Sequence, residues 1–363
     1  MNPFTELTVD GRLMRGAEIT AWADALVERT RYAPWAIDLR TTCRALVDGE
    51  GVLPVRTSGT TGAPKAMELP FADVLASIAL TRAAFDLKAG DRALLCLPCE
   101  FVGGKMMLAR AMVLGLDLHV IDPRGGVLKN LRNQDRFRFA TMVPMQLHTA
   151  LHQDRARVEQ QFDTILLGGG PVSDTLVDEV RELGTRVYDG YGSTETVTHI
   201  ALRKLNDGGP EEYFTTLGKV TVRSDADGRL IAETPHLSTS RHETNDVIDV
   251  LDEHHFKWAG RHDHAILSGG RKILAERLES MTAGVVPYAH FFASRPDERL
   301  GQRVVLVVEK DTSDGVGQEA IMRMVSGMLD EHERPKEVVF VPTFVRTGSG
   351  KVSRERTLER AAG

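Results

Sequence analysis

The sequence predicts an α/β protein: a large N-terminal domain with mostly parallel, helix-covered sheets, followed by a small α+β C-terminal domain. Three observations lead to this class. Short apolar runs alternate with stretches of helical periodicity between residues 70 and 190. The pattern changes to short strands with turns after residue 205. The length of 363 residues is enough for about two domains.

The alternating region supplies the elements of the parallel sheet. Helices are expected at 71–87, 105–114, 145–152 and 173–183, and strands at 93–97, 118–121, 139–143, 164–167 and 186–188. In such sheets ligands gather on the loops beyond the C-terminal ends of the strands. Glycine-bearing loops that fit this position lie at 57–65, 168–171 and 190–195.

The last third of the chain has the pattern of a smaller α+β domain. Strands are expected at 229–233, 247–252, 289–293, 304–308 and 338–341, and a helix at 319–329. The polar stretch at 260–263 interrupts this series and indicates a domain boundary.

Charge and composition indicate which partners and which cellular compartment to expect. A net charge of −6 argues against nucleic acid or an anionic membrane as the main partner. No apolar run approaches the ~18 residues of a membrane span, and the first residues lack the pattern of a signal peptide. Three cysteines, an odd number, favour a reducing cytoplasm. We therefore expect a cytoplasmic protein without membrane insertion.

The cysteine and histidine patterns indicate no metal site. Cys96 and Cys99 form a C-x-x-C pair, but without a second pair they cannot make a structural zinc site. Their apolar neighbours suggest the end of a buried strand, with a redox role as the alternative. The histidines are scattered, and the run at 262–264 lacks the spacing of a known metal motif.

The loop at 57–65 is rich in groups that bind phosphate. It contains four hydroxyl side chains, two glycines and one lysine. Small residues let backbone amides approach an anion, hydroxyls add donors and lysine adds charge. The spacing is not that of a kinase-type P-loop, because Lys65 stands three residues after Gly62 and no Ser or Thr follows it. The loop therefore predicts a nucleotide-phosphate site in some other fold, with an ordinary surface turn as the alternative.

Two later segments carry further candidate groups. Glu195 is a carboxylate that can hold Mg²⁺ beside substrate phosphates, Thr194 offers a hydroxyl to a phosphate, and Tyr191 offers an aromatic face to a base. Asp246 stands just before a predicted strand and can accept both hydroxyls of a ribose. Each of these residues alone is also an ordinary loop, turn or cap residue.

Seven motifs occur in an order that resembles a known superfamily. They are the loop at 57–65, the turn at 168–171, the segment 191–195, Asp246, and the segments 260–263, 269–273 and 350–351. Together they resemble the core motifs of the adenylate-forming enzymes, which include acyl-CoA synthetases, peptide-synthetase adenylation domains and luciferases. Within that superfamily, the segments 97–108 and 198–203 resemble short bacterial 2-succinylbenzoate–CoA ligases of menaquinone biosynthesis.

The resemblance implies an AMP-forming acid–thiol ligase that uses ATP, Mg²⁺ and coenzyme A. In the first half-reaction the substrate carboxylate attacks the α-phosphate of ATP, giving acyl-AMP and pyrophosphate. In the second, the CoA thiolate displaces AMP and forms the thioester.

The resemblance also implies roles for the motif residues. In the phosphate loop, Ser58, Thr60, Thr61 and Lys65 would hold the β- and γ-phosphates, beside Thr57, Gly59 and Gly62. Gly169, Gly170 and Tyr191 would frame adenine, and Asp246 and Arg261 would bind ribose. Thr194 would contact the α-phosphate, and Glu195 would ligate Mg²⁺.

The small domain would contribute mobile groups. Asp263 would mark a hinge at 261–263 between domains 1–260 and 264–363. Lys351 would bridge the substrate carboxylate and the α-phosphate during adenylation. Gly269 and Gly270 would lie in a loop that reaches the site after the small domain rotates. A cation on a mobile domain can serve one step and then withdraw, which leaves space for the thiol.

The chain departs from the superfamily pattern in two places. Only residues 1–56 precede the phosphate loop, so we expect a shortened leading lobe and altered walls of the acyl pocket. A histidine that is frequent after the 94–98 strand is replaced by Glu100 and Phe101. 2-Succinylbenzoate has a second carboxylate that needs a cation or several donors. Lys105, His199 and Arg203 are the candidates, with structural salt bridges as the alternative.

The sequence is also compatible with other functions. The enzyme could activate another aryl or aliphatic acid, with CoA or a carrier protein as acceptor. A catalytically degenerate nucleotide-binding relative is a further alternative, although Lys65, Glu195, Asp246 and Lys351 are all retained. The oligomeric state, a homodimer included, is not fixed by the sequence.

Overall fold

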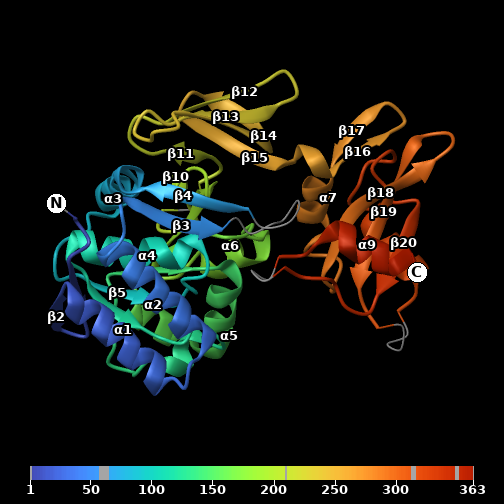
Figure 1. Cartoon of the computed structure of the whole chain (residues 1–363). Helices are drawn as coiled ribbons and strands as arrows, with labels where there is room; N and C mark the ends of the chain where they lie inside the picture. The colour runs from blue at the N-terminus through green and yellow to red at the C-terminus, as the bar shows by residue number, and fades with distance from the viewer. Residues whose placement is uncertain (1, 57–64, 209–210, 312–315, 348–350, 363) are drawn as a thin grey trace. The chain divides into compact units, whose positions relative to one another are not determined.

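The computed structural model describes residues 2–56, 65–208, 211–311, 316–347 and 351–362, which form two compact units (Figure 1). Unit 1 contains residues 1–172, 176–221 and 232–242, and unit 2 contains residues 173–175, 222–231 and 243–363. Unit 2 therefore includes residues on the N-terminal side of position 260. The boundary at 260 and the hinge at 261–263 stay predictions.

The sheet of unit 1 is mostly parallel, which confirms the predicted fold class. Its strands lie in the order β11-β10-β9-β8-β7-β5-β6-β1-β2. The parallel pairs are β1–β6, β5–β6, β5–β7, β7–β8 and β8–β9, and the edges are antiparallel. The strands are β1 (Glu6–Val9), β2 (Arg12–Arg15), β5 (Arg92–Leu95), β6 (Asp117–Val120), β7 (Phe139–Met142), β8 (Thr164–Leu167), β9 (Arg186–Ser193), β10 (Thr198–Lys204) and β11 (Phe214–Thr216).

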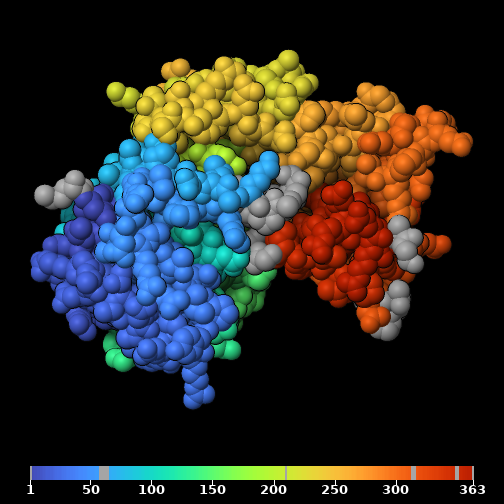
Figure 2. All heavy atoms as spheres, in the orientation of Figure 1, coloured from blue at the N-terminus to red at the C-terminus, as the bar shows by residue number. Residues whose placement is uncertain are grey.

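Helices cover both faces of this sheet (Figure 1). Successive side chains of a strand point to opposite faces. Accordingly Ala93 and Leu95 of β5 pack in one apolar core, while Leu94 and the adjoining Cys96 pack in another. The first core includes α1 (Ala17–Arg29), α2 (Pro34–Val47), α3 (Phe71–Phe85) and α4 (Val102–Leu114). The second includes α5 (Pro144–Gln161), α6 (Asp174–Val180) and η1 (Val127–Asn130). In Figure 2 the side chains of α1 and α2, in blue, cover the lower part of unit 1.

Several elements of unit 1 differ from the predictions. No element was predicted before residue 71, where the structure has β1, β2, α1, α2 and the hairpin of β3 (Val52–Arg56) and β4 (Ala66–Pro70), and strands β10 and β11 were not predicted either. Strand β9 runs on to Ser193, where a loop was expected. Helix α5 continues past the predicted end at residue 152, with a break at Asp154 (φ −166°, ψ 91°). The Asp154 carboxylate accepts a hydrogen bond from the Arg157 amide (3.0 Å), which starts the helix again after the break.

Unit 2 has the α+β composition that the sequence predicts. Its strands are β12 (Thr221–Ser224), β13 (Arg229–Glu233), β14 (Arg241–Asp252), β15 (His255–Arg261), β16 (Ala265–Ser268), β17 (Arg271–Leu274), β18 (His290–Asp297), β19 (Gly301–Glu309) and β20 (Glu337–Val341). Strands β16 to β20 form a separate sheet in which β20 is parallel to β19. The remaining elements are η2 (His262–His264), α7 (Ala275–Thr282), α8 (Gln318–Ser326) and α9 (Arg354–Ala362). Side chains such as Phe292, Leu306 and Ile321 fill the core of this unit.

A buried asparagine joins the end of α6 to β9. The Asn206 side chain accepts a hydrogen bond from the Val187 amide (2.9 Å). Its Nδ2 donates to the carbonyl oxygens of Val180 (3.1 Å), Leu183 (3.0 Å) and Thr185 (2.7 Å). Asn206 has no solvent exposure. The Val180 carbonyl also accepts from the Leu183 amide (2.9 Å), so the Asn206 side chain mainly supplies partners for the Val187 amide and the Leu183 and Thr185 carbonyls.

We expect Asn206→Ala to lower the free energy of unfolding by at least about 3 kcal/mol, because several buried polar groups lose their partner at once. Urea denaturation measures the effect. The matched control is Asn130→Ala: Asn130 is exposed and makes one long bond to the Gly126 carbonyl (3.5 Å). Equal, small losses in both variants would contradict the role of Asn206.

Candidate functional site

The predicted phosphate loop connects the two strands of the β3–β4 hairpin. Arg56, the last residue of β3, pairs with Ala66, the first residue of β4. Lys65 is exposed directly before β4. The predicted ligands Thr57, Ser58, Gly59, Thr60, Thr61 and Gly62 lie outside the described residues. Their roles stay predictions.

The predicted adenine-binding residues lie at neighbouring strand ends. Leu167, the last residue of β8, pairs with Asp189 of the parallel strand β9. Gly169 and Gly170 follow Leu167, and Tyr191 follows Asp189, so the segments leave the parallel part of the sheet at the same edge. Gly169 has a φ of 80°, which favours glycine. The structure therefore brings these predicted residues to one edge of the sheet.

Tyr191 is part of a strand, in contrast to the predicted loop. It pairs with Ala201 of β10, and its ring makes an edge contact with Phe214 (5.8 Å between centroids). The close approach of β10 requires glycine next to it, because a Cβ on Gly192 would lie 1.9 Å from the Thr198 carbonyl oxygen. The strand thus fixes the direction of the Tyr191 side chain, which a loop would leave variable.

Thr194 and Glu195 lie on a strained turn between β9 and β10. Thr194 is half-buried and Glu195 is exposed. The turn ends in Val197 and Thr198, whose φ angles are 50° and 81°. Positive φ is unfavourable for β-branched residues, and such strain often occurs at functional sites. The turn therefore needs support from the residues around it.

Two buried side chains give that support. Ser77 Oγ donates to the Val197 carbonyl oxygen (2.6 Å). Arg110 Nη2 donates to Thr198 Oγ1 (2.9 Å), and Arg110 Nε donates to Thr81 Oγ1 (3.2 Å). These contacts hold the end of the turn that presents Thr194 and Glu195.

Arg110 is the main residue of this region that sequence reasoning missed. It is 1% exposed, and among the described residues its guanidinium makes no ion pair with a carboxylate. Burial lowers the pKa of Arg110 to about 10, so the side chain is still cationic at neutral pH. The available signal was an arginine inside the apolar run at 106–112, where no solvated face is expected.

The three residues predicted to meet a second substrate carboxylate differ in their environments. Lys105 Nζ donates to the Pro54 carbonyl oxygen (2.7 Å), and burial lowers the pKa of Lys105. Arg203 forms an ion pair with Asp189 (3.0 Å), the alternative that the sequence left open. His199 is buried, and its burial beside Arg110 lowers its pKa to about 3. His199 is therefore neutral at pH 7, so it can offer a carboxylate a hydrogen-bond donor but no positive charge.

In unit 2, the predicted ribose ligands face each other across two strands. Asp246 of β14 pairs with Arg261 of β15. Arg261 Nη1 lies 3.5 Å from Asp246 Oδ1, and the guanidinium donates two bonds to Asp263 (2.8 and 2.7 Å). The Arg261 amide donates to Glu276 of α7 (3.2 Å), a residue that the sequence analysis did not select. Asp246 lies within the long strand β14, whereas the sequence placed it just before a strand, with a turn or cap residue as the alternative.

Lys351 belongs to the same charged group. Burial lowers the pKa of Lys351, the Arg261 charge lowers it further, and the Asp246 carboxylate partly opposes the shift. The segment that carries Lys351 is held by antiparallel bonds: Thr347 N donates to the Lys351 carbonyl (2.8 Å), and Ser353 N donates to the Val345 carbonyl (2.8 Å). Asp246, Arg261 and Asp263 thus contact one another in unit 2, and Lys351 lies close enough to Asp246 and Arg261 for their charges to shift its pKa.

Gly269 and Gly270 form the turn between β16 and β17. Both have positive φ angles, 57° and 77°, and the flanking residues Ser268 and Arg271 pair with each other. Gly269 N donates to the Leu300 carbonyl oxygen (2.9 Å). The role of this turn in the thioester step stays a prediction.

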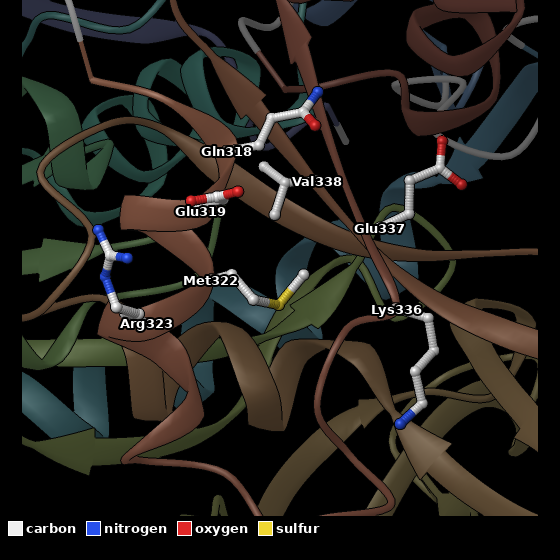
Figure 3. Close-up of a pocket in the computed structure, with 7 residues that line it drawn as sticks. All are labelled: Gln318, Glu319, Met322, Arg323, Lys336, Glu337 and Val338. Atoms are coloured by element: carbon white, nitrogen blue, oxygen red, sulfur yellow. The ribbon is translucent and has the colours of Figure 1, made fainter.

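A hollow of unit 2 lies away from these residues. Figure 3 shows the side chains that line it, from α8, from β20 and from the residue directly before β20: Gln318, Glu319, Met322, Arg323, Lys336, Glu337 and Val338. Glu337 already pairs with Arg303 (2.9 Å). None of the predicted site residues lines this hollow.

Cys96 and Cys99 are buried, and burial raises the pKa of each thiol to about 12. Both are protonated at neutral pH and poorly reactive. Among the described residues, no helix combines the length and apolarity that crossing a membrane requires.

The lowered pKa of His199 predicts acid sensitivity. Folded His199 stays neutral down to about pH 3, whereas the unfolded chain protonates this residue below its ordinary pKa of 6.5. Its contribution to stability is therefore present above pH 6.5 and is lost as the pH falls toward 3. We expect His199→Gln to reduce the loss of stability between pH 7 and 4, measured by urea midpoints. The exposed His254→Gln variant should keep the wild-type pH dependence, and identical profiles for all three proteins would contradict the assignment.

Comparison with known proteins places the chain in a family. Residues 55–228 match the family of AMP-binding enzymes. The chain is 32% identical to an acyl-CoA synthetase (AMP-forming)/AMP-acid ligase II-like protein from Dyadobacter fermentans, with a TM-score of 0.59 over 90% of this chain and 95% of that one. It is 29% identical to a probable 2-succinylbenzoate–CoA ligase of Mycobacterium tuberculosis, over 87% of this chain and 86% of the relative.

A further solved structure supports the fold. The O-succinylbenzoate coenzyme A synthetase of Bacillus subtilis, in complex with ATP and magnesium ion, is 21% identical with a TM-score of 0.70, over 84% of this chain and 69% of that one. The superfamily resemblance of the motifs is thereby confirmed. The chain belongs to the AMP-binding enzyme family, the group that contains the AMP-forming acyl-CoA synthetases.

Proposed function

We propose that this protein is a cytoplasmic ATP-dependent acid–CoA ligase that forms an acyl-adenylate and then a thioester. The grouping of Lys351 with Asp246 and Arg261 in unit 2 is the observation that carries the proposal. In an adenylating enzyme a ribose-binding carboxylate and a cation for the α-phosphate must lie close together, because ribose and α-phosphate are adjacent in ATP.

The chemistry follows from repulsion between two anions. A carboxylate oxygen forms a bond to the α-phosphorus while the bond from phosphorus to the pyrophosphate oxygen breaks. Lys351 would hold both reacting anions, since a cation positioned where charge develops lowers such a barrier. In the second step the CoA sulfur bonds to the acyl carbon and AMP leaves. Withdrawal of Lys351 through the hinge at 261–263 would make room for the thiol.

The oxygen donors of unit 1 suit a magnesium ion. Glu195 is exposed on its turn next to Thr194, and Mg²⁺ favours one or two carboxylates together with substrate phosphates. When bound, the ion would neutralise phosphate charge. The supported turn at 193–198 would hold the Glu195 carboxylate and the Thr194 hydroxyl in place.

We further propose 2-succinylbenzoate as the acid and CoA as the acceptor. The probable 2-succinylbenzoate–CoA ligase of Mycobacterium tuberculosis and the O-succinylbenzoate coenzyme A synthetase of Bacillus subtilis are named for this acid and support the proposal. A dicarboxylic acid leaves one carboxylate to be held within the protein, and a buried carboxylate needs a cation. Arg110 has no carboxylate partner among the described residues, whereas Arg203 is paired, His199 is neutral and Lys105 already donates to the Pro54 carbonyl oxygen, so we choose Arg110 for this role. Menaquinone biosynthesis, implied by the resemblance, is then the pathway.

The first experiment is a pyrophosphate-release screen over aryl, aliphatic and dicarboxylic acids, with CoA added or withheld. We expect release to depend on the acid and on Mg²⁺, with 2-succinylbenzoate as the best substrate. Lys351→Ala should lower acid-dependent release at least about 100-fold. The same variant should largely keep thioester formation from supplied acyl-AMP, because that step does not need the lysine.

The matched control is Lys336→Ala, which removes an exposed lysine of the same unit. It should leave both steps unchanged. Equal loss of both steps in Lys351→Ala would overturn the role of Lys351. If no acid stimulates release in the wild-type protein, the nucleotide-binding relative without activity becomes the better description.

Substitution of Arg110 tests the choice of acid. We expect Arg110→Met to reduce kcat/KM for the dicarboxylic acid about 10- to 100-fold more than for a matched monocarboxylic acid, because the second carboxylate loses its partner. Arg110→Lys should restore part of this selectivity. If Arg110 only supports the turn at 193–198, both acids will lose activity by the same factor.

A further inference from the structure

Two histidines and a glutamate converge on the surface of unit 1, apart from the residues proposed for catalysis. His148 and His152 stand four positions apart on α5, so they lie on the same face of the helix. Glu179 reaches them from α6. One potential ligand atom from each residue lies within 4.8 Å of the others.

The distances between the histidine nitrogens and the Glu179 oxygens suit an ion with tetrahedral coordination. His148 Nδ1 lies 3.0 Å from Glu179 Oε2, and His152 Nε2 lies 3.7 Å from Glu179 Oε1. Two ligands at about 2.0–2.1 Å from a zinc ion are about 3.3 Å apart at the tetrahedral angle. The two measured separations bracket that value, so small side-chain rotations suffice to admit an ion.

The tautomer of one histidine is already the one that a metal ligand requires. His152 Nδ1 donates a hydrogen bond to the His148 carbonyl oxygen (3.0 Å). With its proton on Nδ1, the neutral His152 ring keeps a lone pair on Nε2, which lies 3.7 Å from Glu179 Oε1. Ligating histidines almost always donate their other ring nitrogen to a carbonyl or carboxylate in this way. This hydrogen bond is a separate observation from the distances between ligand atoms, and it also fits a histidine that binds a metal through Nε2.

We propose that His148, His152 and Glu179 bind one zinc-type divalent ion, with water completing the shell. Two imidazole nitrogens and one carboxylate favour Zn²⁺ over Mg²⁺, which prefers oxygen ligands. The side chains of His148 and His152 are 49% and 60% exposed, so an ion can reach them from solvent. The site is separate from the proposed magnesium site at Glu195.

The ion would link two helices on either side of a predicted nucleotide contact. Helix α5 precedes β8, and α6 follows the turn that contains Gly169 and Gly170. A bond network from α5 through the metal to α6 would restrain that turn from both sides. The ion at the proposed site would thus have a structural role, whereas magnesium would bind to the substrate phosphates.

A second cluster is a weaker candidate. Asp330, His332 and Glu333 also come close together. Glu333 is buried, however, and it already accepts bonds from Arg277 (3.3 Å) and from the Asp330 amide (3.4 Å). An ion there would have to displace these partners.

The test uses the full chain without an affinity tag. Titration calorimetry with Zn²⁺ should give one site per chain in the wild-type protein, in the presence of millimolar Mg²⁺. His148→Ala, His152→Ala and Glu179→Gln should each weaken binding at least about 10-fold, and the double histidine variant should lose it. Zn²⁺ should raise the melting temperature of the wild type but not of the double variant.

The matched control is His255→Ala, which removes an exposed histidine paired with Asp252 (2.9 Å). It should bind Zn²⁺ as the wild type does. Circular dichroism checks that every variant is folded, and Glu179→Gln tests the site without altering either histidine. Absence of stoichiometric binding in the wild type, or unchanged binding in the double variant, would overturn the proposal. Neither result bears on acid-dependent pyrophosphate release.

Discussion

Burial of both faces of the parallel sheet is the constraint on which unit 1 depends. Ala93 and Leu95 face one core, and Leu94 faces the other, so the middle of the sheet offers no surface to a ligand. The strand ends and the loops that follow them are therefore where a ligand can meet polar groups of the parallel strands. The β8–β9 register then determines which groups meet there, because it fixes where Gly169 and Tyr191 leave the sheet.

The two buried polar side chains beside this edge differ in charge. His199 and Arg110 share the same interior, yet burial neutralises the histidine and leaves the arginine charged. The difference arises because the ordinary pKa of histidine is near neutrality and that of arginine is far above it. One interior environment thus yields a neutral group and a fixed cation, and only the cation is suited to an anionic partner.

Periodicity predicted the parallel strands between residues 93 and 188 and the helices between them, because helices and strands bury side chains at fixed intervals. It missed the extension of β9 to Ser193, since Gly192 reads as a turn residue although it is needed for the close approach of β10. The motif order predicted the grouping of Asp246, Arg261 and Lys351. It could not reveal Arg110, whose role depends on burial, or the contact of His148 with Glu179, which depends on the packing of α5 against α6.

The backbone at Val197 has a consequence for engineering. A β-branched residue is among the least stable choices at a φ of 50°, and glycine is the most tolerant one. Val197 is nevertheless 1% exposed and packs in the first core, so glycine would relieve the backbone and remove buried apolar contacts at the same time. The buried valine therefore anchors to the core the turn that carries Thr194 and Glu195. Exchange to glycine would leave those two side chains on a less constrained backbone.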